Sequence, residues 1–198
     1  MERTICLAGG CFWGVEKLFR SLPGVLDVTV GYANGTIEEP EKYADYRTVC
    51  TGRTGFREAA MIRYDDTEIS LRHLLFAYFA VIDPTLENRQ GMDFGTQYQT
   101  GIYWTDPKDE AVISDIISIE AAAVEAGGTN YYDDDAEFCV EAGPLVNFYP
   151  AEEYHQRYLE KNPHGYCHIF PSRVEKIRSF AFADDTYTAP AQKLLQIW

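Results

Sequence analysis

The sequence predicts an α+β fold, a two-layer α/β sandwich in which helices pack on a mixed sheet. Along the chain, short strand-like segments alternate with segments whose apolar residues have helical spacing. Several of the strands alternate in polarity, which indicates a sheet covered by helices on one face rather than a doubly wound parallel sheet. A length of 198 residues with 46% apolar content suits one domain of ~100–200 residues. We therefore expect a single domain over residues 1–198, with 172–198 as a C-terminal tail.

In the first part of the chain, strands are predicted at 5–8, 26–32 and 58–64, where the residues are apolar or alternate in polarity. Helices are predicted at 12–22 and 71–82, because apolar residues recur there at i, i+3, i+4 and i+7. Pro23-Gly24 and Asp83-Pro84 end these helices, Ser70 is the expected N-cap of the second, and Asn34-Gly35 forms a turn.

The second part of the chain contains a predicted strand at 100–104, a helix from Asp106-Pro107 to Gly127-Gly128, a strand at 138–141 and a helix at 151–160. Two long polar loops, 36–57 and 85–98, separate the earlier elements. Long loops inside a compact domain are often functional.

Composition excludes several classes of function. The chain has 17 basic and 31 acidic residues, a net charge of −14, and such a field disfavours a nucleic-acid partner. The sequence contains no run of 18 apolar residues, so no membrane span is predicted. The Gly-rich start does not resemble a signal peptide. Five cysteines, an odd number, do not suggest a secreted disulfide framework. We expect a cytoplasmic protein.

The strongest local signal is Gly10-Cys11-Phe12-Trp13-Gly14. Cys11 falls where a predicted strand has ended and a helix begins, and the N–H groups of a first helical turn have no intrahelical partners. A thiolate is stabilised there, so we expect a lowered pKa for Cys11 and a nucleophilic role. Phe12 and Trp13 would place apolar faces beside the sulfur. The alternative is that Cys11 is a small buried hydrophobe and both aromatics belong to the core.

Glu58 opens an otherwise apolar strand, directly after the loop that contains Tyr46 and Cys50. A carboxyl buried by such a strand has a raised pKa and stays protonated, as a general acid requires. The alternative is a solvated carboxylate at the end of the strand. We interpret Cys50 as a structural thiol.

The second polar segment, 83–98, is dense in side chains that make directed hydrogen bonds. Such a segment suits a site that orients a polar substrate atom, although an ordinary solvated loop has the same composition.

A third group contains His155, His164, Cys167 and His168. These are metal-binding residue types, and a metal-binding domain is the alternative from another functional class. No Cys-x-x-Cys pair supports it, so we expect neither a metal nor a cofactor. Cys167 follows Gly165 and a turn, which suits a resolving thiol that attacks an oxidised partner.

Taken together, the chain resembles the A-type peptide methionine sulfoxide reductases over about residues 4–170. The matching segments are GCFWG at 10–14, GYANG at 31–35, TG…E at 54–58, DPT…NRQG at 83–91, GTQY at 95–98 and AEEYHQRYL…NPHGYC at 151–167. The resemblance implies a ferredoxin-like core and reduction of the S epimer of methionine sulfoxide, free or in peptides. It also implies a monomer recycled by thioredoxin or another dithiol, and a role in repair of oxidised proteins.

The resemblance implies a role for each matching position. Cys11 would be the nucleophile, Phe12 and Trp13 the walls around the substrate methyl group, and Glu58 the acid that protonates the sulfoxide oxygen. The hydroxyls of Tyr46 and Tyr98 would donate to that oxygen, with Asp93 as a polar support. Cys167 would be the first recycling cysteine, and no cysteine follows it.

Several positions depart from the family pattern. Phe56 and Ile82 each stand where histidine is common, Met92 stands where asparagine usually precedes the aspartate, and Gln99-Thr100 replace Arg-Ser. The alternative from the same redox chemistry is a peroxide-reducing or sensor thiol protein, which would use Cys11 but would not need the Phe12-Trp13 slot.

Overall fold

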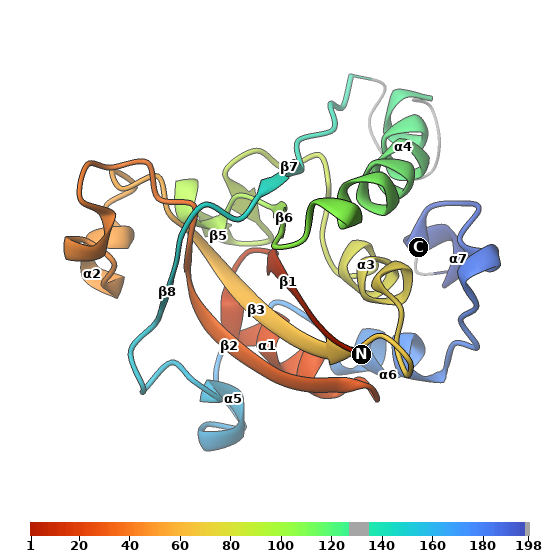
Figure 1. The fold of residues 1–198 in the computed structure, drawn as a ribbon, viewed down its shortest axis with the longest axis horizontal. Coiled ribbons are helices and arrows are strands. Elements are labelled where there is room, and N and C mark those ends of the chain that lie inside the picture. Colours follow the sequence, from red (N-terminus) through yellow and green to blue (C-terminus); the bar gives the residue numbers. More distant parts are fainter. Residues whose placement is uncertain (127–134, 197–198) are drawn as a thin grey trace.

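The computed structural model describes residues 1–126 and 135–196, and its framework is a six-stranded sheet (Figure 1). The strand order is β7-β6-β1-β3-β2-β8. Neighbouring strands are antiparallel except β6 and β7, which are parallel, so the mixed sheet is confirmed. The strands are β1 (Glu2–Ala8), β2 (Val25–Ala33), β3 (Arg57–Asp65), β6 (Gly101–Trp104), β7 (Glu141–Pro144) and β8 (Phe148–Pro150).

The central strands have the topology of a ferredoxin-like core. The chain runs β1, α1 (Phe12–Arg20), β2, β3, α3 (Leu71–Phe79) and β6, and these four strands are ordered β6-β1-β3-β2. Apolar residues of α1, α3 and α4 (Glu110–Glu125) share one hydrophobic core with the strands. Helices therefore cover one face of the sheet, as predicted.

The remaining elements are short. They are α2 (Tyr46–Val49), β4 (Arg89–Gln90), β5 (Asp93–Phe94), α5 (Tyr158–Lys161), α6 (Pro171–Ser179), α7 (Ala191–Leu194) and 3-10 turns at Pro40–Lys42, Thr96–Tyr98, Pro107–Asp109 and Asp184–Thr186. The long loops thus contain α2 in one case and the β4-β5 hairpin in the other. The Ser70 cap is confirmed, since its hydroxyl accepts the N–H of His73 at 3.1 Å.

Two predicted elements are wrong in position. The strand predicted at 138–141 begins only at Glu141, because the N–H of Cys139 bonds to the carbonyl of Pro84 instead of to a strand. The helix predicted at 151–160 begins only at Tyr158. Before Tyr158, the Gln156 side chain hydrogen-bonds the backbone N–H and C=O of Val30 in β2, and these contacts keep residues 151–157 from forming a helix. The predicted helix end at Gly127-Gly128 lies outside the described residues.

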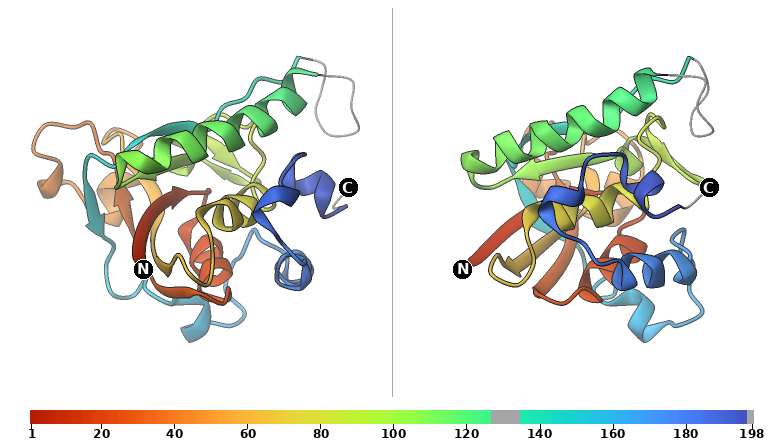
Figure 2. Two further views of the ribbon diagram at one scale, coloured as in Figure 1. Left: turned by 45° about the vertical axis from the view of Figure 1, so that its right-hand side comes forward. Right: turned by 90° about the vertical axis from the view of Figure 1, so that its right-hand side faces the viewer.

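The C-terminal segment packs against the helical layer (Figure 2). Ile177, Ala191 and Leu195 are buried in the same core as α3 and α4. The buried carboxyl of Glu120 in α4 accepts the Tyr187 hydroxyl at 2.6 Å and the Ala191 N–H at 2.8 Å. Among residues 1–126 and 135–196, no helix is long and apolar enough to cross a membrane.

Candidate active site

Cys11 lies at the N-terminal end of α1, as predicted, and its side chain is 7% exposed. Gly9 and Gly10 connect it to β1. Gly10 has φ +81°, and a Cβ there would lie 2.6 Å from the Cβ of Gln90. Only glycine suits this position, because it combines left-handed backbone with close packing.

A pocket of about 210 Å³ opens beside the Cys11 sulfur. Its lining residues come from α1, α2, β3, the β4-β5 region and the segment before α6: Cys11, Phe12, Trp13, Tyr46, Glu58, Asp93, Tyr98 and Tyr166. The structure therefore brings together every predicted site residue except Cys167 in one pocket. Tyr166 is the one that the sequence analysis missed.

Glu58 points from β3 to the start of α1. Its carboxyl is 1% exposed and accepts the backbone N–H of Phe12 at 3.1 Å. Burial raises the pKa of Glu58 to about 8, with a smaller contribution from the charge of Asp93 and against the effect of the Phe12 N–H. The carboxyl is therefore a protonated acid at neutral pH.

Burial raises the pKa of Cys11 well above its ordinary value, and the neighbouring Glu58 charge adds to this. The backbone N–H of Trp13 acts in the opposite direction. The lowered pKa expected from the helix start is thus wrong, because desolvation of the thiolate outweighs the helix N–H groups. In this pocket, Cys11 and Glu58 are both protonated at neutral pH.

Tyr46 and Tyr98 add two hydroxyls to the same pocket. Burial, reinforced by the Glu58 charge, raises the pKa of Tyr98. Burial also raises the pKa of Tyr46, and the neighbouring Cys50 thiol and Glu58 raise it further. Both hydroxyls therefore keep their protons and can donate. Tyr46 is held by its own N–H, which donates to Glu152 at 2.8 Å.

Trp13 forms a wall that other residues hold rigidly. Its ring stacks on Tyr158 at 3.7 Å between centroids, and its Nε1–H donates to Nδ1 of His155 at 3.1 Å. Phe12 is buried, with the His155 ring 5.1 Å away. His155 and Tyr158 were not predicted to hold Trp13. The only sequence signal for them was the polar and aromatic run at 152–158.

Asp93 lines the pocket and is fixed by Tyr166, whose hydroxyl donates to it at 2.9 Å. This bond joins the β4-β5 hairpin to the chain segment that carries Cys167. The neighbouring Met92 points outward, with 76% of its surface exposed.

Cys167 does not line this pocket, but it lies directly behind the start of α1. A Cβ built on Gly14 would be 3.3 Å from its sulfur, and Gly14 is on the same helix face as Cys11 because the two are three positions apart. All five cysteines are free, and Cys50 is exposed at the end of α2. In the described part of the chain, no three His, Cys, Asp or Glu side chains form a metal-binding group.

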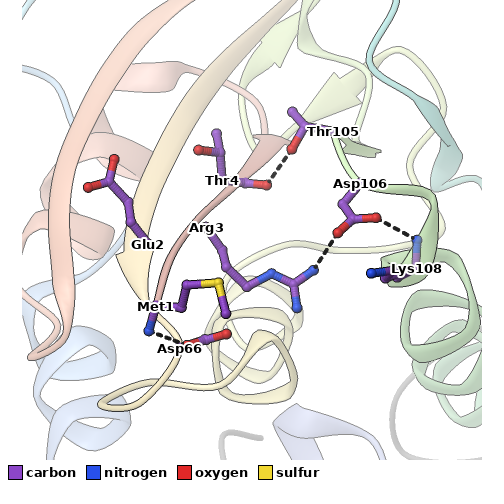
Figure 3. A pocket seen from close by; sticks show the side chains of 8 residues that line it. All are labelled: Met1, Glu2, Arg3, Thr4, Asp66, Thr105, Asp106 and Lys108. Atoms are coloured by element: carbon purple, nitrogen blue, oxygen red, sulfur yellow. Dashed lines mark hydrogen bonds and ion pairs between the residues drawn. The ribbon is translucent and has the colours of Figure 1, made fainter.

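A larger cavity of about 390 Å³ lies at the other end of β1 (Figure 3). Arg3 there pairs with Asp106 at 3.5 Å, and the N-terminal amine pairs with Asp66 at 2.5 Å. Its lining contains no thiol or histidine. The smaller pocket, which joins a thiol to a protonated acid, is therefore the candidate for chemistry.

Comparison with known proteins identifies the family. The family model described as peptide methionine sulfoxide reductase matches residues 3–185. The chain belongs to this family. A peptide methionine sulfoxide reductase MsrA from Clostridium acetobutylicum is 50% identical over 174 residues, which cover 88% of this chain and 99% of that protein. The MsrA of Mycoplasma genitalium is 47% identical over 168 residues, 84% of this chain and 98% of that protein.

Solved structures of the peptide methionine sulfoxide reductase family share the fold. Methionine sulfoxide reductase A of Corynebacterium diphtheriae has a TM-score of 0.74 at 37% identity, over 84% of this chain and 77% of that one. The reduced form of Mxr1 from Saccharomyces cerevisiae has a TM-score of 0.73 at 36% identity, over 85% of this chain and 91% of that one. The protein is thus an oxidoreductase of a family that reduces methionine sulfoxide.

Three of the departures from the family pattern, Phe56, Ile82 and Gln99, have structural roles here. Phe56 is buried against Tyr32, with ring centroids 6.2 Å apart. Ile82 is buried in the main core. Gln99 is also buried, and its amide joins the Asn88 N–H to the carbonyl of Cys139. None of these substitutions removes a residue that lines the pocket.

Proposed function

We propose that the enzyme reduces the S epimer of methionine sulfoxide, free or in proteins, by attack of Cys11 on the sulfoxide sulfur. The observation that carries this proposal is that a protonated Glu58 shares one small pocket with the Cys11 thiol. A sulfoxide has a poor leaving oxygen, so attack at sulfur requires a donor at that oxygen.

In the first step, an oxygen atom moves from the substrate to Cys11. Glu58 protonates the sulfoxide oxygen while Tyr46 and Tyr98 donate hydrogen bonds to it, and the Cys11 sulfur attacks the polarised sulfur. The proton that leaves the Cys11 thiol returns to Glu58. The hydroxyl then moves from the substrate sulfur to the Cys11 sulfur as the new S–S bond and the substrate S–O bond break, so methionine departs and Cys11 becomes a sulfenic acid. One well-placed donor of this kind lowers the activation free energy by about 3–4 kcal/mol.

The shape of the pocket supports selection of one epimer. We assign Phe12 and Trp13 to an apolar side of the pocket, and Glu58, Tyr46 and Tyr98 to a polar side. The sulfoxide sulfur is a stereocentre, so a pocket that binds methyl on one side and oxygen on the other accepts one hand.

In the second step, Cys167 attacks the Cys11 sulfenic acid, water leaves and a Cys11–Cys167 disulfide forms. The position of Cys167 against Gly14, behind Cys11, supports this role. A dithiol reductant, which we propose to be thioredoxin, then restores both thiols of the monomeric enzyme. A yeast relative, Mxr1, is known in both a reduced and an unusual oxidised form.

The test is an epimer-resolved assay with dabsyl-methionine sulfoxide and dithiothreitol. We expect the S epimer to be consumed and the R epimer to remain. Turnover of hydrogen peroxide without turnover of either epimer would instead assign the protein to the peroxide-reducing thiol class. Equal turnover of both epimers would contradict the division of the pocket into an apolar and a polar side.

A further inference from the structure

The ring of His155 packs against residues from both sides of the substrate pocket, although it does not line the pocket itself. His155 is 1% exposed. Its ring centroid lies 5.7 Å from that of Trp13 and 4.6 Å from that of Tyr46. A change in this ring therefore reaches the substrate through the residues that surround it.

The hydrogen bond to Trp13 determines where the proton of the His155 ring lies. The indole Nε1–H of Trp13 donates to Nδ1 of His155 at 3.1 Å. An indole N–H can only donate, so Nδ1 is the unprotonated nitrogen and Nε2 carries the hydrogen. Only the neutral imidazole, in this one tautomer, can hold Trp13 in this way.

The other ring nitrogen does not select this tautomer. Nε2 of His155 is buried and has no hydrogen-bond partner among residues 1–126 and 135–196. Oε2 of Glu152 lies 4.0 Å away, which is beyond hydrogen-bond range. The bond to Trp13 is therefore the contact that fixes the tautomer.

A second proton on the ring would turn its contact with Trp13 from attraction into repulsion. In the imidazolium both nitrogens carry a hydrogen, so the Nδ1–H of His155 would face the indole N–H, donor against donor. The charged ring would also be attracted to Glu152. Glu152 is itself fixed, because it accepts the N–H of Tyr46 at 2.8 Å and the hydroxyl of Tyr32 at 2.7 Å.

We propose that His155 is a positioning residue whose neutral ring holds the Trp13 wall of the substrate pocket through Nδ1, and that protonation of the ring releases this wall. This inference rests on the proposed function, because it requires Trp13 to bound the space for the substrate methyl group. Without the Nδ1 bond, Trp13 still stacks on Tyr158 at 3.7 Å, but stacking leaves the indole free to shift within its plane. Substrate should then bind more weakly, while the reacting groups stay in place.

The groups around the ring place this change on the acidic side of neutrality. Burial lowers the pKa of His155 from its ordinary value of 6.5, whereas the Glu152 charge acts in the opposite direction. Tyr46 from α2 and Tyr154 from the same segment also pack on the ring, and burial raises the pKa of both, so they stay neutral. The α1 rings that contact it carry no charge. His155 is therefore neutral at pH 7 and gains its proton only below pH 6.5.

The experiment measures single-turnover methionine release against substrate concentration, at several pH values between about 5 and 7. In the wild type, we expect the half-saturating concentration of methionine-S-sulfoxide to rise about fivefold at the acidic end, as loss of one hydrogen bond implies. The plateau rate should stay constant, because Glu58, with a pKa of about 8, is protonated throughout this range.

Two substitutions separate the acceptor from the titration. His155→Leu has no acceptor, so its half-saturating concentration should be raised at every pH, and an unchanged plateau rate shows that the variant is folded. His155→Asn places an amide oxygen where Nδ1 was and cannot be protonated. It should keep the wild-type value of pH 7 at every pH. His164→Asn, at an exposed histidine nearby, is the matched control and should titrate like the wild type.

A double-mutant cycle tests whether Trp13 carries the effect. Trp13→Phe removes the N–H that His155 accepts, so adding His155→Leu to it should raise the half-saturating concentration by much less than fivefold. Three results would overturn the proposal: full additivity in this cycle, an acidic rise that persists in His155→Asn, or a value in His155→Asn as high as in His155→Leu. Failure of the wild type to release methionine from the S epimer at any pH would instead overturn the proposed function.

Discussion

The backbone N–H of Phe12 donates to the Glu58 carboxyl at 3.1 Å. This one bond joins the helix start that carries the thiol to the strand that carries the acid, 46 positions later in the sequence. Because the Glu58 side chain is bonded to the backbone of the residue after Cys11, its carboxyl is held beside the helix start that carries the nucleophile.

Cys11→Ser should abolish reduction of methionine-S-sulfoxide, since a hydroxyl is far less nucleophilic than a thiol at the same site. The measurement is methionine release by chromatography under single-turnover conditions. Cys139→Ser is the control, because Cys139 does not line the pocket, and it should retain activity. Methionine release by Cys11→Ser would remove the central proposal.

Glu58→Gln should slow methionine release by about a hundredfold or more, because the amide cannot transfer a proton. In the wild type the active form is the protonated acid. The rate should therefore be steady near neutral pH and fall as pH rises through the Glu58 pKa of about 8. A flat profile together with an unchanged rate in Glu58→Gln would assign Glu58 to structure alone.

Tyr46→Phe and Tyr98→Phe should each slow methionine release by about tenfold, and the double variant should lose more than either single one. Each hydroxyl stabilises charge on the same oxygen, so one donor partly compensates for loss of the other. Single-turnover rates of the four proteins form a double-mutant cycle. Tyr43→Phe, an exposed tyrosine outside the pocket lining, is the control.

Cys167→Ser should still release one equivalent of methionine, because Cys11 and the oxygen donors are intact. Turnover with thioredoxin should collapse, since thioredoxin attacks a disulfide, whereas dithiothreitol should reduce the sulfenic acid directly and keep part of the activity. Mass spectrometry of oxidised wild-type protein should show a Cys11–Cys167 bond. A bond to Cys50 or Cys139, with thioredoxin turnover intact in Cys167→Ser, would identify a different partner.

We propose that residues 1–198 fold as one unit, with Glu120 holding the C-terminal segment. Burial raises the pKa of Glu120 from 4.5 to about 7. When the pKa of an acid is higher in the folded than in the unfolded state, the protein loses stability as that acid ionises. Here the loss should occur as pH rises from 4.5 through 7. Glu120→Gln has no charge to bury, so its Tm should match wild type near pH 4 and exceed it at pH 8.

The control for this measurement is Glu125→Gln, on the exposed end of the same helix. Its Tm should follow the wild-type curve at both pH values. Parallel Tm curves for Glu120→Gln and wild type would show that Glu120 does not couple folding to pH.

Local patterns predicted most of the elements around the site. The strand before Cys11, the helix after it and the strand of Glu58 could be predicted because their apolar periodicity is strong. The conformation of residues 151–157 could not be predicted in this way, because a contact between residues distant in sequence determines it. The Gln156 side chain hydrogen-bonds the backbone of Val30 in β2. Likewise, Trp13 is held by His155, which is 142 positions away in the sequence.

The sequence by itself determined the fold class, the place of Cys11 at a helix start and most of the residues that line the pocket around it. The raised pKa of Glu58 was also predicted from its place in an apolar strand, whereas only the tertiary structure decided the protonation of Cys11. The helix start alone favours a Cys11 thiolate, but packing β3 and the loop residues over it removes water, and burial raises the pKa of both Cys11 and Glu58. Desolvation depends on everything that surrounds a group in space, and no local pattern of residues contains that information.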